Sequence, residues 1–401
     1  MIIFAEKYAQ MNKLRENPFW LGTQIPDEYF CDRERETEDL IRLFFNRNNV
    51  VLKAERRTGK TSLLNHIATR PVIRETFNTY YVDIYATKSL AEFVKTFADA
   101  LGSKAVNDLT RTSLTDALKS LQFTLGSNMF TGKPELSVGM NPAAIIRPEV
   151  SIREIFTWLE ATKKPNLIVF DEFQQIKEYE DGDAAPLLRS YIQSCNNCVF
   201  VFSGSDRHML DVMFTDKNEP FFRSCTERNL QLIPEDVYCS YAERMFMLGK
   251  YKVDMDSLNK LYRLMHGYTA YLNRVLNGVY SYLNPGDVCN SEFICHSIRD
   301  ILDGTDFYDK LKGYRKAEWD LLKAIARNRV VSAPTSSAFI KDNYLVSASK
   351  VQTSLNKLLK NKLVMDTGKA SRELQLSDVF MEIWFRLTFD KSSLSVQLEQ
   401  A

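Results

Sequence analysis

The first half of the chain contains five apolar runs of strand length, separated by segments in which apolar residues recur at helical spacing. They lie at residues 49–54, 80–85, 166–171, 198–203 and 228–233. Residues 167–170 are consecutively apolar, which is typical of a strand buried on both faces of a parallel sheet. Strands that alternate with helices predict such a sheet with helices covering both sides. The expected fold class is therefore α/β, with a three-layer core.

Beyond Pro234 the pattern becomes helical. Apolar residues recur at three- and four-residue spacing in 236–249, 255–266, 269–283 and 291–302, which predicts a bundle of helices that follows the sheet as a lid.

The C-terminal pattern predicts two helices, a turn, a third helix and a hairpin. The helices are expected at 317–327, 336–343 and 347–361, and the hairpin at 363–376. This is the outline of a winged helix-turn-helix domain, which docks a helix on DNA in many proteins and packs against protein in others. The candidate phosphate contacts are Lys350, Lys357, Lys360, Lys369 and Arg372.

Two segments carry no assigned chemistry. Residues 121–148 are rich in glycine and proline and predict a hairpin insertion, and the Ser/Gln-rich tail after Phe389 is expected to fray.

A loop between a strand and a helix at residues 49–64 carries the most chemical information. The phosphate-loop pattern G-x-x-x-x-G-K-[ST] is met at Gly59, Lys60 and Thr61, with Ala54 in place of its first glycine. In such loops the glycine lets the backbone approach phosphate, the lysine reaches the β- and γ-oxygens, and the hydroxyl holds magnesium. The expected contacts to ATP and Mg²⁺ are Ala54, Arg56, Arg57, Thr58, Gly59, Lys60, Thr61 and Ser62. A loop that merely turns a strand into a helix is the alternative.

Two carboxylates end the apolar strand at 166–171. Asp171 can orient magnesium together with Thr61, and Glu172 can polarise an attacking water. The strand at 198–203 ends in small polar residues, so Ser203 or Ser205 is a candidate to contact the γ-phosphate or that water. A Ser-Gly-Ser turn without a catalytic part is the alternative. Lys60, Glu172 and Ser203 are the catalytic candidates at this point.

These stretches together resemble the archaeal/bacterial ATPase family of the AAA+-related STAND P-loop NTPases. The family loop G-P-R-R-x-G-K-T corresponds to residues 54–61, its D-E-F-Q to 171–174, and its lead-in N-P-F to 17–19. The resemblance implies an AAA+/ASCE-like P-loop core, a helical lid and a winged helix. It also implies that Arg33 lies near the adenine and that Arg223 is an arginine finger or sensor, acting within the subunit or on a neighbour. A surface arginine in a loop is the alternative for Arg223.

The charge, the cysteine count and the length of the apolar runs limit the partners and the compartment that we expect. Lys and Arg number 52 against 51 Asp and Glu, so the net charge of +1 excludes an indiscriminate polyanion binder. Residues 313–388 nevertheless hold 13 basic and 7 acidic side chains, which makes the C-terminal module basic. The 7 scattered cysteines fit a reducing compartment, and no apolar run is long enough to span a membrane, so a cytoplasmic protein is expected.

The predicted organisation has five parts. They are a lead-in that packs on the nucleotide site at 1–45, a P-loop ATPase core at 46–234, a lid at 235–312, a winged helix at 313–388 and a tail at 389–401. The predicted function is a Mg²⁺-dependent ATPase that acts as a switch between ATP and ADP states, with duplex DNA as a candidate partner. The alternative is a regulatory or scaffold ATPase with protein partners, which self-associates on binding ATP and turns over slowly or not at all.

Overall fold

The computed structural model describes residues 16–104, 108–127, 134–180, 182, 184–284, 286–367 and 373–401. The chain divides into two compact units. The sheet unit comprises Arg33–Arg56 and Lys60–Gln231, and the C-terminal unit comprises Met1–Asp32, Arg57–Gly59 and Leu232–Ala401. Among the described residues, no helix combines the length and the apolar character needed to cross a bilayer.

The sheet unit is built on one five-stranded sheet with the order β2-β5-β6-β1-β7. Every neighbouring pair of these strands is parallel. The strands are β1 (Val50–Ala54), β2 (Asn78–Asp83), β5 (Asn166–Asp171), β6 (Cys198–Gly204) and β7 (Thr226–Leu230). All residues of β1, β5 and β6 are buried, as their apolar runs predict. The predicted parallel sheet is confirmed.

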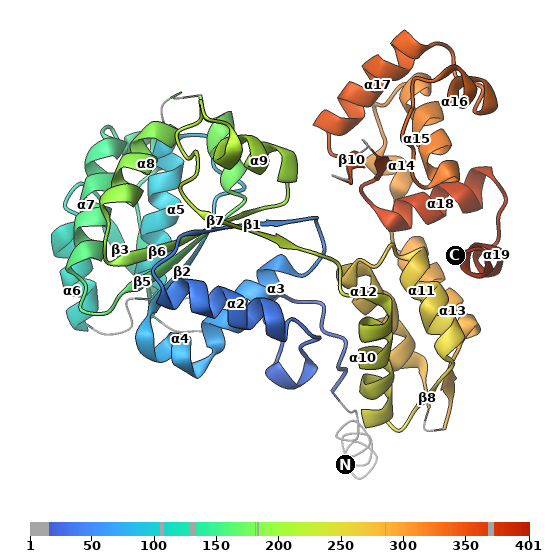
Figure 1. The fold of residues 1–401 in the computed structure, drawn as a ribbon, viewed down its shortest axis with the longest axis horizontal. Helices are drawn as coiled ribbons and strands as arrows, with labels where there is room; N and C mark the ends of the chain where they lie inside the picture. The colour runs from blue at the N-terminus through green and yellow to red at the C-terminus, as the bar shows by residue number, and fades with distance from the viewer. Residues whose placement is uncertain are drawn as a thin grey trace, which may run out of the picture. The chain divides into compact units, whose positions relative to one another are not determined.

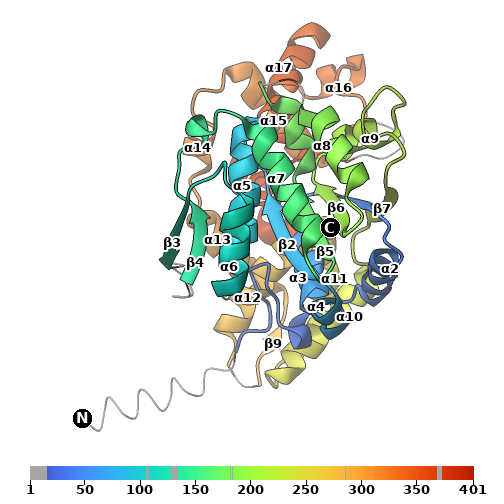
Figure 2. The same cartoon turned by 90° about the vertical axis from the view of Figure 1, so that its left-hand side faces the viewer.

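Helices cover both faces of this sheet (Figures 1 and 2). One face carries α2 (Glu34–Phe45), α3 (Lys60–Thr69) and α4 (Pro71–Thr76). The other carries α5 (Leu90–Ser103), α7 (Pro148–Ala161), α8 (Ala184–Ser194) and α9 (Arg207–Thr215). Aromatic side chains fill the second interface: the rings of Phe170 and Phe200 stack with centroids 6.2 Å apart, and Phe97 meets Phe170 edge-on at 5.1 Å. The three-layer architecture is confirmed.

The insertion after α6 (Asp108–Ala117) forms the predicted hairpin. Strands β3 (Phe123–Ser127) and β4 (Pro134–Val138) pair antiparallel, and β4 packs on α5. Leu136 and Val138 are buried, so this hairpin extends the core of the sheet unit.

Four helices form the first part of the C-terminal unit. They are α10 (Glu235–Leu248), α11 (Met255–Leu264), α12 (Thr269–Tyr282) and α13 (Ser291–Asp303), and they lie at the predicted positions. Two short strands, β8 (Lys252–Val253) and β9 (Val288–Cys289), pair between them. The segment before α2 belongs here: the Asn17 amide donates to the carbonyl of Asn277 at 2.9 Å, and Phe19 is fully buried. The predicted lead-in at 1–45 divides between the two units after Asp32, and its packing on the nucleotide site stays a prediction.

The winged-helix pattern follows. It consists of α14 (Phe307–Lys310), α15 (Lys316–Asn328), α16 (Ser337–Asp342), α17 (Ala348–Lys360), β10 (Val364–Asp366), β11 (Leu374–Leu376) and α18 (Val379–Phe389). The Ser347 hydroxyl caps α17, and β10 pairs antiparallel with β11. Val351, Leu355 and Leu358 are buried on one side of α17, as the spacing predicts.

The expectation of a frayed tail is wrong. Residues Leu394–Glu399 form a helix, α19, that packs on α11, α13 and α18. Leu394 and Leu398 are one helical turn apart and both buried, and the amide of buried Gln397 donates to the carbonyl of Ser392 at 3.0 Å. A helix of six residues is too short to be stable alone in water, so burial of this apolar pair stabilises it.

Candidate nucleotide site

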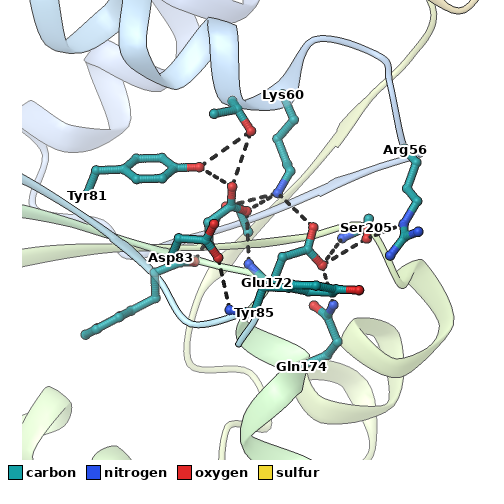
Figure 3. A network of polar contacts seen from close by, with 12 residues as sticks. Arg56, Lys60, Tyr81, Asp83, Tyr85, Glu172, Gln174 and Ser205 are labelled. Carbon is teal, nitrogen blue, oxygen red and sulfur yellow. Dashed lines mark hydrogen bonds and ion pairs between the residues drawn. The ribbon is translucent and has the colours of Figure 1, made fainter. Parts of the chain in front are cut away.

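Lys60 meets the two carboxylates at the end of β5 (Figure 3). Lys60 is the first residue of α3, and Asp171 is the last residue of β5. Only 7% of Lys60 and 5% of Asp171 is exposed, and the lysine ammonium donates to Asp171 Oδ1. The same nitrogen lies 3.9 Å from Glu172 Oε1 and 3.4 Å from the Ser203 hydroxyl. The predicted catalytic candidates Lys60, Glu172 and Ser203 therefore lie together.

Asp171 is the centre of this network. Its Oδ1 accepts from the Ser203 hydroxyl at 2.7 Å, and its Oδ2 accepts from the hydroxyls of Thr61, at 3.3 Å, and Tyr81. Burial alone would raise the pKa of Asp171, but the charge of Lys60 and these hydrogen bonds outweigh it and hold the pKa below its usual value. Asp171 is accordingly a carboxylate at neutral pH.

Tyr81 is a site residue that the sequence did not reveal. Burial and the adjacent Asp171 carboxylate raise the pKa of its phenol, so it stays a hydrogen-bond donor. It comes from β2, next to β5 in the sheet, where Asp83 is the register partner of Asp171. A tyrosine in an apolar run looks like a core residue, so only the strand order could have identified it.

Glu172 is held from its other side. Its Oε2 accepts from the Gln174 amide at 2.5 Å and from the Ser205 hydroxyl at 2.9 Å, and Arg56 Nε in turn donates to Ser205 at 3.2 Å. Glu172 has a left-handed backbone, with φ of 55°, so the chain turns sharply where β5 ends. After this turn Glu172 contacts Gln174 and Ser205, while its other oxygen stays near the Lys60 ammonium that Asp171 also binds.

The donor set fits magnesium bound through phosphate. In the part of the chain that the structure describes, no group of three or more His, Cys, Asp or Glu side chains could hold a metal ion. Magnesium needs few protein ligands when phosphate oxygens and water complete its shell. The Thr61 hydroxyl and the Asp171 carboxylate, 3.3 Å apart, are hard oxygen donors suited to that arrangement.

The middle of the phosphate loop groups with the C-terminal unit. The Arg57 guanidinium lies 4.4 Å from the centroid of the Tyr271 ring and donates to the carbonyl of Ser377 at 2.8 Å. The Thr269 hydroxyl donates to the carbonyl of Arg57 at 3.2 Å. Thr58 is buried, and Gly59 has a φ of +88°, a conformation that a side chain would strain.

The other predicted site residues lie apart from this network. Ala54 is buried at the end of β1, and Ser62 is half-buried in α3. Arg33 is buried and bonds Glu36 at 2.7 Å and the carbonyl of Gln231 at 2.6 Å. Arg223 is exposed, with its guanidinium 5.0 Å from the centroid of the Phe222 ring. Roles for Arg33 and Arg223 at the nucleotide remain predictions.

The lysines predicted to contact DNA differ in their surroundings. Lys350 and Lys360 are exposed on α17. Lys357 is half-buried, 3.4 Å from Glu318 Oε1 and 5.0 Å from the centroid of the Tyr314 ring, so part of its charge is neutralised. Lys369 and Arg372 lie outside the described residues.

Comparisons with known proteins agree with this architecture. Residues 305–387 match the family described as a probable winged helix domain. A Walker-type ATPase of Pyrococcus abyssi is 18% identical with a TM-score of 0.62, over 92% of this chain and 99% of that one. The Aeropyrum pernix ORC2 protein, in ADPNP–ADP complexes, is 14% identical with a TM-score of 0.56, over 96% and 98%. Curated proteins give no match.

A third structure, the Aeropyrum pernix ORC1 protein in complex with DNA, is 14% identical with a TM-score of 0.50, over 94% of this chain and 95% of that one. At these identities the likeness is one of fold. The chain has the parallel-sheet α/β core of P-loop ATPases, followed by a C-terminal winged helix.

Proposed function

We propose that this protein binds and hydrolyses ATP with Mg²⁺ and uses the reaction as a conformational switch. The observation that carries the proposal is the buried Lys60 at the start of α3, beside Asp171 and Glu172 at the end of β5. A helix N-terminus with a lysine attracts phosphate, and the adjacent carboxylates supply the metal ligand and the base.

Each residue has a distinct task in this proposal. Bound Mg²⁺ would neutralise phosphate charge, held by Thr61 and Asp171. Lys60 exchanges its bond to Asp171 for phosphate oxygens, while Tyr81 and Ser203 keep the Asp171 carboxylate ionised and oriented. Glu172, positioned by Gln174 and Ser205, accepts a proton from the attacking water.

Two substitutions separate binding from hydrolysis. Lys60→Ala should weaken ATP binding, measured by calorimetry, because it removes the cation that reaches the phosphates. Glu172→Gln should keep binding but lower the release of phosphate by about a hundredfold or more, because an amide is a poor base. Equal hydrolysis by wild-type protein and Glu172→Gln would exclude Glu172 as the base.

We infer the switch from the chemistry of the nucleotide. ATP and ADP differ by the γ-phosphate, which Lys60 and Thr61 contact in this proposal, so the two nucleotides can favour different conformations of the chain. The loop resembles that of STAND-type ATPases, and a switch of that type is expected to self-associate on binding ATP. Sizing with ATP, with ADP and without nucleotide tests it, and identical sizes in all three conditions would contradict it.

Duplex DNA is the partner proposed for the winged helix. The match over residues 305–387 and the exposed Lys350 and Lys360 on α17 favour this role. Replacing both lysines with Glu should weaken duplex binding and reduce its salt dependence, because each lysine that contacts phosphate displaces about one counterion. An unchanged affinity would favour the alternative, a regulatory ATPase with protein partners.

A further inference from the structure

A pocket lies in the sheet unit at the opposite end of the sheet from Asp171. It has a volume of about 930 Å³, in the range of small-molecule sites. Its lining includes Asn78 and Thr79 at the start of β2, and Lys164, which precedes β5. Asn78 pairs with Asn166 at this end of the two strands, whereas Asp83 pairs with Asp171 at the other. The pocket and the nucleotide site are therefore separate.

The charge of this pocket is one-sided. Arg74, Lys104, Lys163 and Lys164 line it, and no Asp or Glu does so among its described lining residues. Lys164 Nζ donates to the carbonyl of Arg74 at 2.7 Å, which fixes two segments of the wall. Basic side chains without an acidic neighbour attract anions, and Arg74, Lys104 and Lys163 are exposed, so an anion in solution can reach them.

Polar and aromatic side chains complete the wall. The hydroxyl of Thr79 is buried and has no hydrogen-bond partner among the described residues, so the protein leaves a polar group unsatisfied at this wall. Trp158 and Phe77 also line the pocket with nearly buried rings, and the Trp158 indole donates to the Ser113 hydroxyl at 3.2 Å. The wall therefore combines the edges of two aromatic rings with hydroxyl groups.

We propose that this pocket binds a small molecule carrying two or more phosphate groups. Arginine and lysine prefer phosphate oxygens, hydroxyls complete their hydrogen bonds, and the volume suits a ligand of nucleotide size. The proposal does not depend on ATP hydrolysis, because it uses none of the residues around Lys60.

Inorganic tripolyphosphate is a suitable probe, measured by calorimetry in EDTA. The Lys60→Ala variant removes the phosphate loop as a competing site, and one bound tripolyphosphate per chain is expected. Adding Arg74→Ala, Lys104→Ala and Lys163→Ala should weaken binding by about tenfold or more. A control with Lys88→Ala, Lys119→Ala and Lys217→Ala loses the same charge at residues outside the pocket and should keep its affinity.

Hydrogen exchange on the wild-type protein provides a test that needs no variant. Tripolyphosphate should protect the backbone amides of 77–80 and 161–164 from exchange. Protection confined to 57–62, equal losses in the pocket and control variants, or no binding to folded Lys60→Ala would each overturn the proposal. Pocket-dependent binding of a single-stranded oligonucleotide without binding of tripolyphosphate would also overturn it, in favour of a polymeric ligand.

Discussion

The two ends of the central sheet differ in whether their polar side chains have partners within the protein. At the carboxyl end, Lys60 and Asp171 neutralise each other, and the hydroxyls of Ser203 and Tyr81 are used by the same carboxylate. At the amino end, four basic side chains share a pocket without an acidic lining residue in the described chain, and the Thr79 hydroxyl has no partner. At the carboxyl end, residues of the protein itself pair with the polar groups. At the amino end, we propose that a phosphate ligand pairs with the basic side chains.

The largest expected effect comes from breaking the buried pair. Asp171→Asn leaves the Lys60 ammonium buried opposite a neutral amide, which should cost about 3 kcal/mol or more of the free energy of unfolding. Urea unfolding measures it. The exposed Glu38→Gln is a control expected to stay within about 0.5 kcal/mol of wild type. A loss for Asp171→Asn no greater than that of the control would show that the pair does not support the fold.

Acid should remove the contribution that the ionised Asp171 carboxylate makes to the free energy of unfolding. The pKa of Asp171 lies below its ordinary value of 3.8 in the folded protein, so its contribution is complete above about pH 5 and is lost as the pH falls through the folded pKa. The difference in unfolding free energy between wild type and Asp171→Asn should therefore shrink as the pH falls from 5 towards 3. Urea titrations across that range measure it, and a difference that grows in acid would reverse the assigned direction of the pKa shift.

The smallest expected effects are changes in stability when one hydroxyl is removed at each end of the sheet, and these changes should have opposite signs. Ser203→Ala removes a satisfied hydroxyl and should destabilise the protein by about 1 kcal/mol. Thr79→Val replaces an unsatisfied buried hydroxyl with a methyl group and should stabilise it by a similar amount. Thermal unfolding without ligand compares them. Destabilisation by both would show that Thr79 has a partner after all.

The fold was largely predictable because its strands are buried on both faces. Their apolar runs stand out, and the loop ending in Lys60 and the carboxylates after residue 170 mark where chemistry occurs. Tyr81 could not be predicted, because its role depends on β2 lying next to β5. The basic pocket at the amino end of the sheet could not be predicted either, because Arg74, Lys104 and Lys163 are far apart in sequence. Tertiary packing, not local preference, likewise determines α19.

The packing of α19 affects the order in which the two units can fold during synthesis. Phe19 and Leu398 belong to one hydrophobic core, although the whole sheet unit lies between them in sequence. The sheet unit is almost continuous in sequence and can fold first. This core cannot be completed until residues 394–399 have been synthesised, on the order of ten to thirty seconds after the end of the sheet unit at ordinary elongation rates. During that interval the surfaces of α11, α13 and α18 that α19 covers remain exposed and accessible to chaperones.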